Sequence, residues 1–549
     1  MKRNKLTALF LSAALTVTML AGCGQSKSTD NKVSTSQDTG SQTASTAADS
    51  ESAVSSEETE PASEGIVFPL EETQKFSMFA VIAGAEYALE DNVSFQKLCE
   101  DTNIQFDIQS VLNADKKEKK NLSLASGEYP DVFFKAGFSA TELSKYGNQG
   151  ILIPLQDLIR EYAPNLTKLL DERDAWKYLT SSDGHVYSLP EIGRQEGAIT
   201  TCWINKKWMD NLGLEEPKSI DDLYNVLKAF KEQDANGNGD TTDEIPLTAT
   251  DAVKPDLLLP YFGINYDYNT KLAVIDGELT YIPTADVYKE YVEFITKLYQ
   301  EGILDKNAFT QAHEQQGAIG QANDVLGCFF DAGAFLTVGR DNDDDYIALK
   351  PFEEGTYPLN TGVTPGTLVI TDYCENPETV VAFFDQFYSE EGGIKAIMGI
   401  EGKTWRMNDE GDWEWILDGE YGSDVGTIRA SATIQGAANH PSIWPDFWYS
   451  NMSENVDPDE VYLNAERAAL AETGVVPLPA MNYDEEDSMT LSTIKTDVDA
   501  YINQYVAQVA TGELTLEESW DEYVATLENM GAGQMLEIYQ AAYDAGIAE

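Results

Sequence analysis

Basic residues are scarce in this chain of 549 residues, where 36 Lys and Arg stand against 94 Asp and Glu and give a net charge of −58. Binding to nucleic acid needs a basic patch, and the sequence shows none, so we exclude a nucleic-acid partner. The same deficit excludes electrostatic adhesion to anionic lipid. We expect the excess acidic residues to form a solvated surface.

Catalytic signatures are also missing. The three histidines, His185, His313 and His440, are isolated, which leaves little room for histidine-based catalysis. No G-x-S-x-G or H-E-x-x-H motif occurs, and residues 399–404 only look like a phosphate loop because Ile397 replaces its first glycine. Carboxylate pairs of the glycosidase kind arise by chance among 94 acidic residues. We predict no catalytic residues and a protein that is not an enzyme.

Cysteine is rare as well, and no C-x-x-C or Cys/His cluster indicates a metal site. Cys202 and Cys328 lie in apolar runs typical of strands, so buried free thiols are at least as good a prediction as disulfides. Together with Cys99 and Cys374 they allow three disulfide pairings. Nothing after Cys23 is long and apolar enough to span a bilayer.

The N-terminal residues have the pattern of a secretion signal. A basic start at residues 2–5 precedes an apolar run, residues 6–20, that has the length of a secretory signal and is too short for an ordinary membrane span. Residues 20–23, Leu-Ala-Gly-Cys, resemble the lipobox of bacterial lipoproteins. The resemblance implies a signal peptide over residues 1–22 and acyl chains such as palmitate on Cys23, which hold the mature chain at the outer face of the cell membrane. The alternative is a plain cleaved signal with a chance cysteine.

A polar segment follows Cys23. Residues 24–64 consist mostly of Ser, Thr, Gln, Ala, Asp and Glu, so they cannot bury enough apolar surface to offset the entropy lost on ordering. We therefore predict a disordered acidic tether that, with the lipidated cysteine, spans residues 23–74 and lets the body reach away from the membrane.

Short strands and helices alternate beyond the tether, with order expected from about Phe76. Residues 76–82 and 130–134 have the apolar character of buried strands, and residues 104–111 alternate like a strand. Ser219 and Asp222 fit a capping box before an amphipathic helix, and residues 491–545 are mostly helical with breaks near Gly512 and Gly531. These patterns predict an α/β body with parallel sheets.

Six phrases occur in the order found in one protein family. They are residues 125–132 (ASGEYPDV), 150–155 (GILIPL), 183–190 (DGHVYSLP), 204–208 (INKKW), 399–405 (GIEGKTW) and 511–514 (TGEL). Over most of residues 75–549 the chain resembles the extracellular solute-binding proteins of ABC importers, family 1, which includes maltose and oligosaccharide binders. The resemblance implies a two-lobed α/β fold of the periplasmic-binding-protein kind, with a hinge and an interlobe ligand cleft. The expected parts are lobe 1 (75–190), lobe 2 (191–365), a return to lobe 1 (366–435) and a C-terminal helical part that completes the lobes (436–549).

Sugar binding needs flat apolar faces and planar polar groups, which the 9 Trp and 27 Tyr of this chain suit. In the family, loops at the ends of strands face the cleft, and the corresponding loops here carry the candidate ligand-binding residues. These are Glu86, Tyr87, Lys135 and Phe138 in lobe 1, Asp251, Phe330 and Asp331 in lobe 2, and Trp444 and Trp448 in a Trp-rich segment. Core packing is the alternative for each Trp, and the favoured one for Trp405, Trp413 and Trp415 in a predicted hairpin.

One loop has the spacing of a calcium site. Oxygen-bearing side chains stand at positions 1, 3, 5 and 7 of an EF-hand-type loop, namely Asp234, Asn236, Asn238 and Asp240. Gly239 is at position 6, but Ile245 is at position 12, so Glu244 would have to supply the last ligand. Because Pro246 argues against a second helix, the loop is either a structural Ca²⁺ site or a polar turn, and no cofactor is required.

The sequence therefore predicts a monomeric, lipid-anchored protein that captures a small solute, above all an oligosaccharide, and delivers it to ABC permease subunits. Hinge closure would favour the form that binds the solute better. Two alternatives remain open, a secreted glycoside-active enzyme and a carbohydrate-sensing surface protein without a role in transport.

Overall fold

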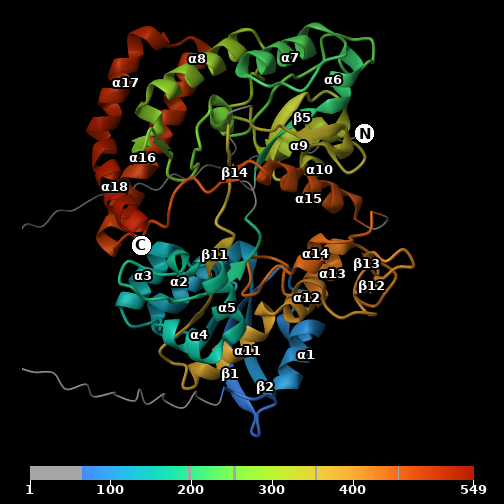
Figure 1. The fold of residues 1–549 in the computed structure, drawn as a ribbon, viewed down its shortest axis with the longest axis vertical. Coiled ribbons are helices and arrows are strands. Elements are labelled where there is room, and N and C mark those ends of the chain that lie inside the picture. The colour runs from blue at the N-terminus through green and yellow to red at the C-terminus, as the bar shows by residue number, and fades with distance from the viewer. Residues whose placement is uncertain (1–64, 196–199, 252–254, 353–354, 455–456, 549) are drawn as a thin grey trace, which may run out of the picture. The chain divides into compact units, whose positions relative to one another are not determined.

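The computed structural model describes residues 65–195, 200–251, 255–352, 355–454 and 457–548 (Figure 1). The predicted signal peptide, Cys23 and most of the predicted tether lie outside the described residues. The first strand begins at Gln74, close to the predicted onset of order at Phe76. In the described part of the chain, no helix has both the length and the apolar character needed to cross a membrane.

The first lobe is built on a five-stranded sheet in the order β2-β1-β3-β11-β4. Its strands are β1 (Gln74–Ile82), β2 (Ile104–Leu112), β3 (Val132–Phe134), β4 (Leu189–Ile192) and β11 (Val363–Ile370). β1 pairs in parallel with β2 and β3, whereas β11 runs antiparallel to β3 and β4. β1 is apolar because both of its faces are buried: Met78 and Ala80 enter one hydrophobic core, and Phe79 and Val81 enter another.

Nine helices, counted over the described residues, pack against this sheet or extend it. They are α1 (Val93–Thr102), α2 (Lys116–Ser126), α3 (Ala140–Asn148), α4 (Gln156–Tyr162), α5 (Pro164–Glu172), α11 (Pro377–Asp385), α12 (Glu390–Met398), α13 (Val425–Ala432) and α14 (Asp446–Tyr449). The predicted Trp hairpin is present as β12 (Trp405–Met407) and β13 (Trp413–Trp415). Its three tryptophans are buried in the core of this lobe, so their predicted packing role is confirmed.

The second lobe has a smaller sheet, in which β5 (Thr201–Asn205) lies between β8 (Cys328–Asp331) and β9 (Tyr346–Ala348). β5 pairs antiparallel with both neighbours, so the expectation of parallel sheets is wrong for this lobe. The physical reason is that β8 and β9 begin at the end of the sheet where β5 finishes, so both run in the opposite direction to β5. Cys202 and Cys328 are free thiols buried in this sheet with their Sγ atoms 3.4 Å apart, and Cys99 and Cys374 are free as well.

The second lobe is mostly helical. Its helices are α6 (Lys206–Leu212), α7 (Ile220–Glu232), α8 (Asp286–Gln300), α9 (His313–Ala322), α10 (Ala334–Val338), α15 (Pro458–Ala471), α16 (Glu485–Thr511), α17 (Leu516–Met530) and α18 (Ala532–Ala548), with a hairpin of β6 (Leu272–Ile275) and β7 (Glu278–Tyr281). Ser219 caps α7 by accepting the Asp222 N–H at 3.1 Å, but the Asp222 carboxylate accepts the Lys218 N–H at 3.3 Å, so only half of the predicted capping box forms. Gly512 and Gly531 end α16 and α17 in the left-handed conformation, as the sequence predicts.

The chain crosses between the lobes three times, between β4 and β5, between β9 and β11, and between α14 and α15 (Figure 1). A short parallel pair joins β10 (Tyr357–Pro358), in the second crossing, to β14 (Gly474–Val475), which follows α15. The first sheet stops at Ile192 and resumes at Val363. Two sheets joined by three crossings form the two-lobed α/β fold that the sequence predicts.

Candidate functional site: a groove between the lobes

A groove of 760 Å³ lies between α2 and α3 of the first lobe and α16 of the second. α3 and α16 also contact each other directly. The groove is lined by Lys116, Lys117, Lys120, Asn121, Ala136, Gly137, Ser139, Thr141, Glu142, Lys145, Tyr146, Glu485, Ser488, Met489, Ser492 and Thr493. Because its walls belong to different lobes, a solute bound here would contact both.

Lys120 fixes the wall formed by the first lobe. Its side chain is almost fully buried, and Nζ donates to the Gly137 carbonyl at 3.0 Å and to Glu142 Oε2 at 2.7 Å. The ammonium group also lies 4.4 Å from the centre of the Phe138 ring, which is buried. Burial lowers the pKa of Lys120, and repulsion from Lys116 and Lys117 adds to this effect against the pairing with Glu142. Phe138, a sequence candidate, therefore packs behind the groove wall.

Three further lysines in the groove wall carry unneutralised charge. Lys116 is half-buried and Lys117 exposed on α2, while Lys145 lies on α3, 5.2 Å from the ring centre of Tyr146. Among the described residues, none of the three forms an ion pair. The groove wall therefore has a local basic patch, and the expectation of no basic patch is wrong there. The run Lys-Lys-Glu-Lys-Lys at residues 116–120 indicates this patch, although the composition of the whole chain is strongly acidic.

The candidate Lys135 lies at the carboxyl end of β3 and is buried, with a positive φ of 63°. Its Nζ donates to the Ile434 carbonyl at 2.7 Å and to the Gly436 carbonyl. Burial lowers the pKa of Lys135 to about 7, against the attraction of Glu191. Lys135 therefore holds the loop at residues 434–436 onto the first lobe.

His440 joins this buried polar cluster. Its backbone N–H donates to Glu191 at 3.0 Å, its Nε2 lies 3.3 Å from Glu191 Oε2, and its Nδ1 lies 2.9 Å from the Ser442 hydroxyl. Burial lowers the pKa of His440, which favours the neutral ring. The imidazole ring centre lies 5.6 Å from that of Trp444.

The two candidate tryptophans differ in exposure. Trp444 is half-buried beside the first crossing, where its backbone N–H donates to the Ile192 carbonyl at 2.7 Å. Trp448 is 1% exposed and packs on Trp413 at 5.1 Å and on Trp444 at 5.4 Å between ring centres. Trp444 is therefore partly exposed, whereas Trp448 is buried beside it.

The remaining candidates are spread over both lobes. Glu86 is exposed and Tyr87 half-buried in the turn after β1, and Asp251 is exposed on the second lobe. Phe330 is fully buried in the core of that lobe. Its neighbour Asp331 is nearly buried and accepts hydrogen bonds from the Thr337 hydroxyl at 2.6 Å and the Ala332 N–H at 2.7 Å, with His313 Nε2 2.8 Å away. Of the candidates, Trp444 and Trp448 lie next to each other, whereas Phe330 has no surface exposed to a solute.

The predicted calcium loop directly follows α7. Gly237 and Gly239 have φ of 76° and 91°, which lets the backbone turn tightly. The Gly239 N–H donates to Asp234 Oδ2 at 2.9 Å, and the Asp240 N–H donates to Asn238 Oδ1 at 2.7 Å. These bonds close the loop on itself.

Three carboxylate oxygens in this loop are buried without a hydrogen-bond partner among the described residues: Asp234 Oδ1, Asp243 Oδ1 and Glu244 Oε2. An unpaired buried carboxylate oxygen costs free energy, and a hard cation with oxygen ligands would satisfy it. The described residues hold no group of three or more His, Cys, Asp or Glu side chains placed to hold a metal ion. The unpaired oxygens are the one observation in favour of a cation here, and they add Asp243 to the candidates that the sequence pattern indicates.

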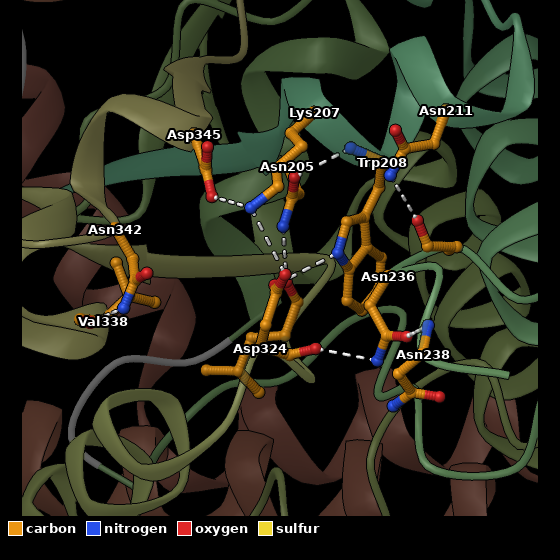
Figure 2. Close-up of polar contacts among 12 residues, drawn as sticks. Asn205, Lys207, Trp208, Asn211, Asn236, Asn238, Asp324, Val338, Asn342 and Asp345 are labelled. Carbon is orange, nitrogen blue, oxygen red and sulfur yellow. Dashed lines mark hydrogen bonds and ion pairs between the residues drawn. The ribbon is translucent and has the colours of Figure 1, made fainter. Parts of the chain in front are cut away.

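The loop is tied to the sheet of the second lobe through Asp324 (Figure 2). Asn236 Nδ2 donates to the Asp324 carbonyl at 2.9 Å, and Trp208 Nε1 donates to the Asp324 carboxylate at 3.1 Å. Lys207 lies 3.6 Å from the same carboxylate, and Asn211 Nδ2 donates to the Ala235 carbonyl at 3.0 Å. An ion in the loop would therefore stabilise the junction of β5 and α6.

Residues 79–394 match the family of bacterial extracellular solute-binding proteins. The chain belongs to this family. It is 30% identical over 509 residues to the fructooligosaccharide ABC transporter substrate-binding protein FusA of Streptococcus pneumoniae, covering 88% of this chain and 92% of FusA. It is 29% identical over 469 residues to the polygalacturonan/rhamnogalacturonan-binding protein YtcQ of Bacillus subtilis, covering 80% and 86% of the two chains.

A solved structure of S. pneumoniae FusA, an EF-hand mutant in complex with fructo-nystose, superimposes with a TM-score of 0.67 and 26% identity. The superposition covers 86% of this solute-binding protein and 99% of that chain. The predicted family and the two-lobed fold are thereby confirmed.

Proposed function

We propose that this solute-binding protein captures an oligosaccharide between its lobes and delivers it to the permease of an ABC importer. The observation that carries the proposal is the interlobe groove, whose walls present the Asn121 amide from α2 and hydroxyl side chains from α3 and α16 to one space. The names of the relatives FusA and YtcQ, which are binders of fructooligosaccharide and of polygalacturonan or rhamnogalacturonan, support it.

Capture requires no covalent chemistry. An oligosaccharide that contacts both lobes stabilises the closed form over the open one, and the population shifts by the difference in affinity. Hydroxyl donors on Ser139 and Ser492, on opposite walls, would hold sugar hydroxyls from two sides. The protein thus acts as a binder and not as an enzyme.

Location completes the function. Acyl chains on Cys23 would hold the protein at the outer face of the membrane, next to its permease. The protein would act there as a monomer. The acidic composition, with a net charge of −58, would not hold it there by electrostatic attraction.

A structural calcium ion is the third part of the proposal. Asp234, Asn236, Asn238, Asp240 and Glu244, with Asp243 beside them, would supply its oxygen ligands. The description of the FusA structure as an EF-hand mutant supports an ion at such a loop.

The test is a thermal-shift screen of the purified Cys23→Ser protein over neutral and acidic oligosaccharides, followed by chromatography of the recovered sugars. A rise in melting temperature with intact sugar supports the binder. Cleaved sugar would instead support the glycoside-active enzyme. Uptake of the sugar that is unchanged in a strain lacking this protein would favour the sensing alternative.

A further inference from the structure

We propose that the interlobe groove selects oligosaccharides that carry carboxylate groups, so that the solute is an acidic oligosaccharide. This inference rests on the proposed function and specifies the class of solute. It arises from the charge and chemistry of the groove walls, which contrast with the rest of the chain.

The charge balance of the groove walls favours an acidic solute. Four lysines and two glutamates line the groove, and Lys120 is neutralised by Glu142 at 2.7 Å. Lys116, Lys117 and Lys145 then face a single remaining carboxylate, that of Glu485. Positive charge is therefore in excess in this groove, in a chain where acidic residues outnumber basic ones by 94 to 36.

Placing these lysines close together costs free energy. Like charges close together on a helix destabilise it, and an anion placed between them relieves the repulsion. Burial, with the neighbouring Lys116 and Lys117, lowers the pKa of Lys120. An acidic solute would neutralise charge that the protein itself leaves uncompensated.

The groove also offers partners for an extended, hydroxyl-rich solute. Uncharged polar side chains line its walls together with the lysines: Asn121, Ser139, Thr141, Ser488, Ser492 and Thr493. A small inorganic anion would need only the lysines, whereas a sugar chain uses hydroxyl and amide partners as well. Tyr146 adds a ring against which a sugar face can pack.

The two lobes contribute different chemical groups to the groove. The lysines belong to α2 and α3 of the first lobe, and the hydroxyls of Ser488, Ser492 and Thr493 belong to α16 of the second. A carboxylated sugar would anchor its charge on the first lobe and its hydroxyls on α16. A solute bound in this way would hold the two lobes together.

The experiment compares matched pairs of sugars on the Cys23→Ser protein by titration calorimetry. The probes are oligogalacturonate and oligomannuronate, each beside its fully methyl-esterified form, with neutral fructooligosaccharides as a further set. We expect at least about tenfold tighter binding of an acid than of its ester, with the difference shrinking as salt screens the charges.

The decisive variant is Lys116→Gln with Lys117→Gln. We expect it to weaken binding of the acid by about tenfold and binding of the ester by much less, and a melting temperature like that of wild type verifies folding. The matched control, Lys97→Gln with Lys168→Gln, removes two exposed lysines of α1 and α5 that pair within their own helices. It should bind like wild type.

The outcomes separate the two proposals. Binding of neutral sugars or esters as tight as that of the acids, or equal loss in the decisive and control variants, would overturn the acidic solute and leave the oligosaccharide binder intact. Binding of no oligosaccharide of either class would overturn both.

Discussion

Asp457 and Arg429 form an ion pair across the third crossing, with Asp457 Oδ2 3.6 Å from the Arg429 guanidinium. Arg429 lies on α13 of the first lobe, whereas Asp457 immediately precedes α15, which packs in the second. Asp457 Oδ1 is also 3.6 Å from Arg340, which follows α10 of the second lobe. A nearly buried carboxylate is thus shared by arginines of both lobes.

Removal of one partner should destabilise this link. Arg429→Gln leaves the carboxylate of Asp457 less well compensated, and we expect the free energy of unfolding to fall by about 1–3 kcal/mol. Denaturant unfolding measures the change. Lys395→Gln, which breaks an exposed pair with Glu391 within α12, is the control and should cost much less. Equal losses in the two variants would contradict the role of the shared carboxylate.

The pH dependence of stability should report on Asp385. Its carboxylate accepts the N–H groups of Asn165 at 3.2 Å and Leu166 at 2.9 Å at the start of α5, and burial raises its pKa to about 6. Because the folded state binds this proton more tightly than the unfolded state, whose pKa is about 3.9, the contribution of Asp385 to stability is greatest below about pH 4 and is lost as pH rises through about 6. The difference approaches about 3 kcal/mol.

Asp385→Asn removes that titration. We expect the difference in unfolding free energy between pH 7 and pH 5 to be smaller or reversed relative to wild type, as measured by urea unfolding at both values. A variant and wild type with parallel stability changes between these pH values would show that Asp385 does not titrate there.

Calcium should raise the melting temperature through the loop after α7. Binding to the folded state alone stabilises it in proportion to the logarithm of ion concentration, so calcium removal with a chelator should lower the melting temperature of wild type by several degrees. Asp234→Ala should abolish this response, and Asp221→Ala, the same charge change on the first turn of α7, should retain it. If wild type and Asp234→Ala respond identically, the loop holds no ion.

Membrane attachment should depend on Cys23 alone. Cys23→Ser should release the protein into the medium and leave its affinity for the solute unchanged, because the tether and the groove are separate parts of the sequence. Fractionation of cells with a salt wash checks the location. A variant that stays with the membrane after the wash would mean that another contact holds it.

Local signals in the sequence were strong where one segment decides its own structure. Ser219 predicted the start of α7 because an N-cap needs only a side-chain oxygen and the next turn. Gly512 and Gly531 predicted the ends of α16 and α17 because a left-handed C-cap favours glycine. The phrases of the family predicted the two-lobed fold, which depends on their order along the chain.

Tertiary contacts were beyond local patterns. Lys117 and Ser492 face one groove although they are far apart in sequence, and no periodicity in either helix indicates this meeting. Similarly, Trp444 and Trp448 lie in one short segment, yet only the Trp hairpin that packs against Trp448 decides which of them keeps an exposed face. The antiparallel course of β11 depends on the chain returning from the second lobe.

The central claim is that an oligosaccharide binds between the lobes, closes them and leaves intact. The most direct measurement is titration of the Cys23→Ser protein with the oligosaccharide panel, with small-angle scattering and sugar analysis at saturation. We predict saturable binding, a smaller radius of gyration in the complex and full recovery of the uncleaved sugar. Binding with an unchanged radius of gyration, or recovery of cleaved sugar, would contradict the account.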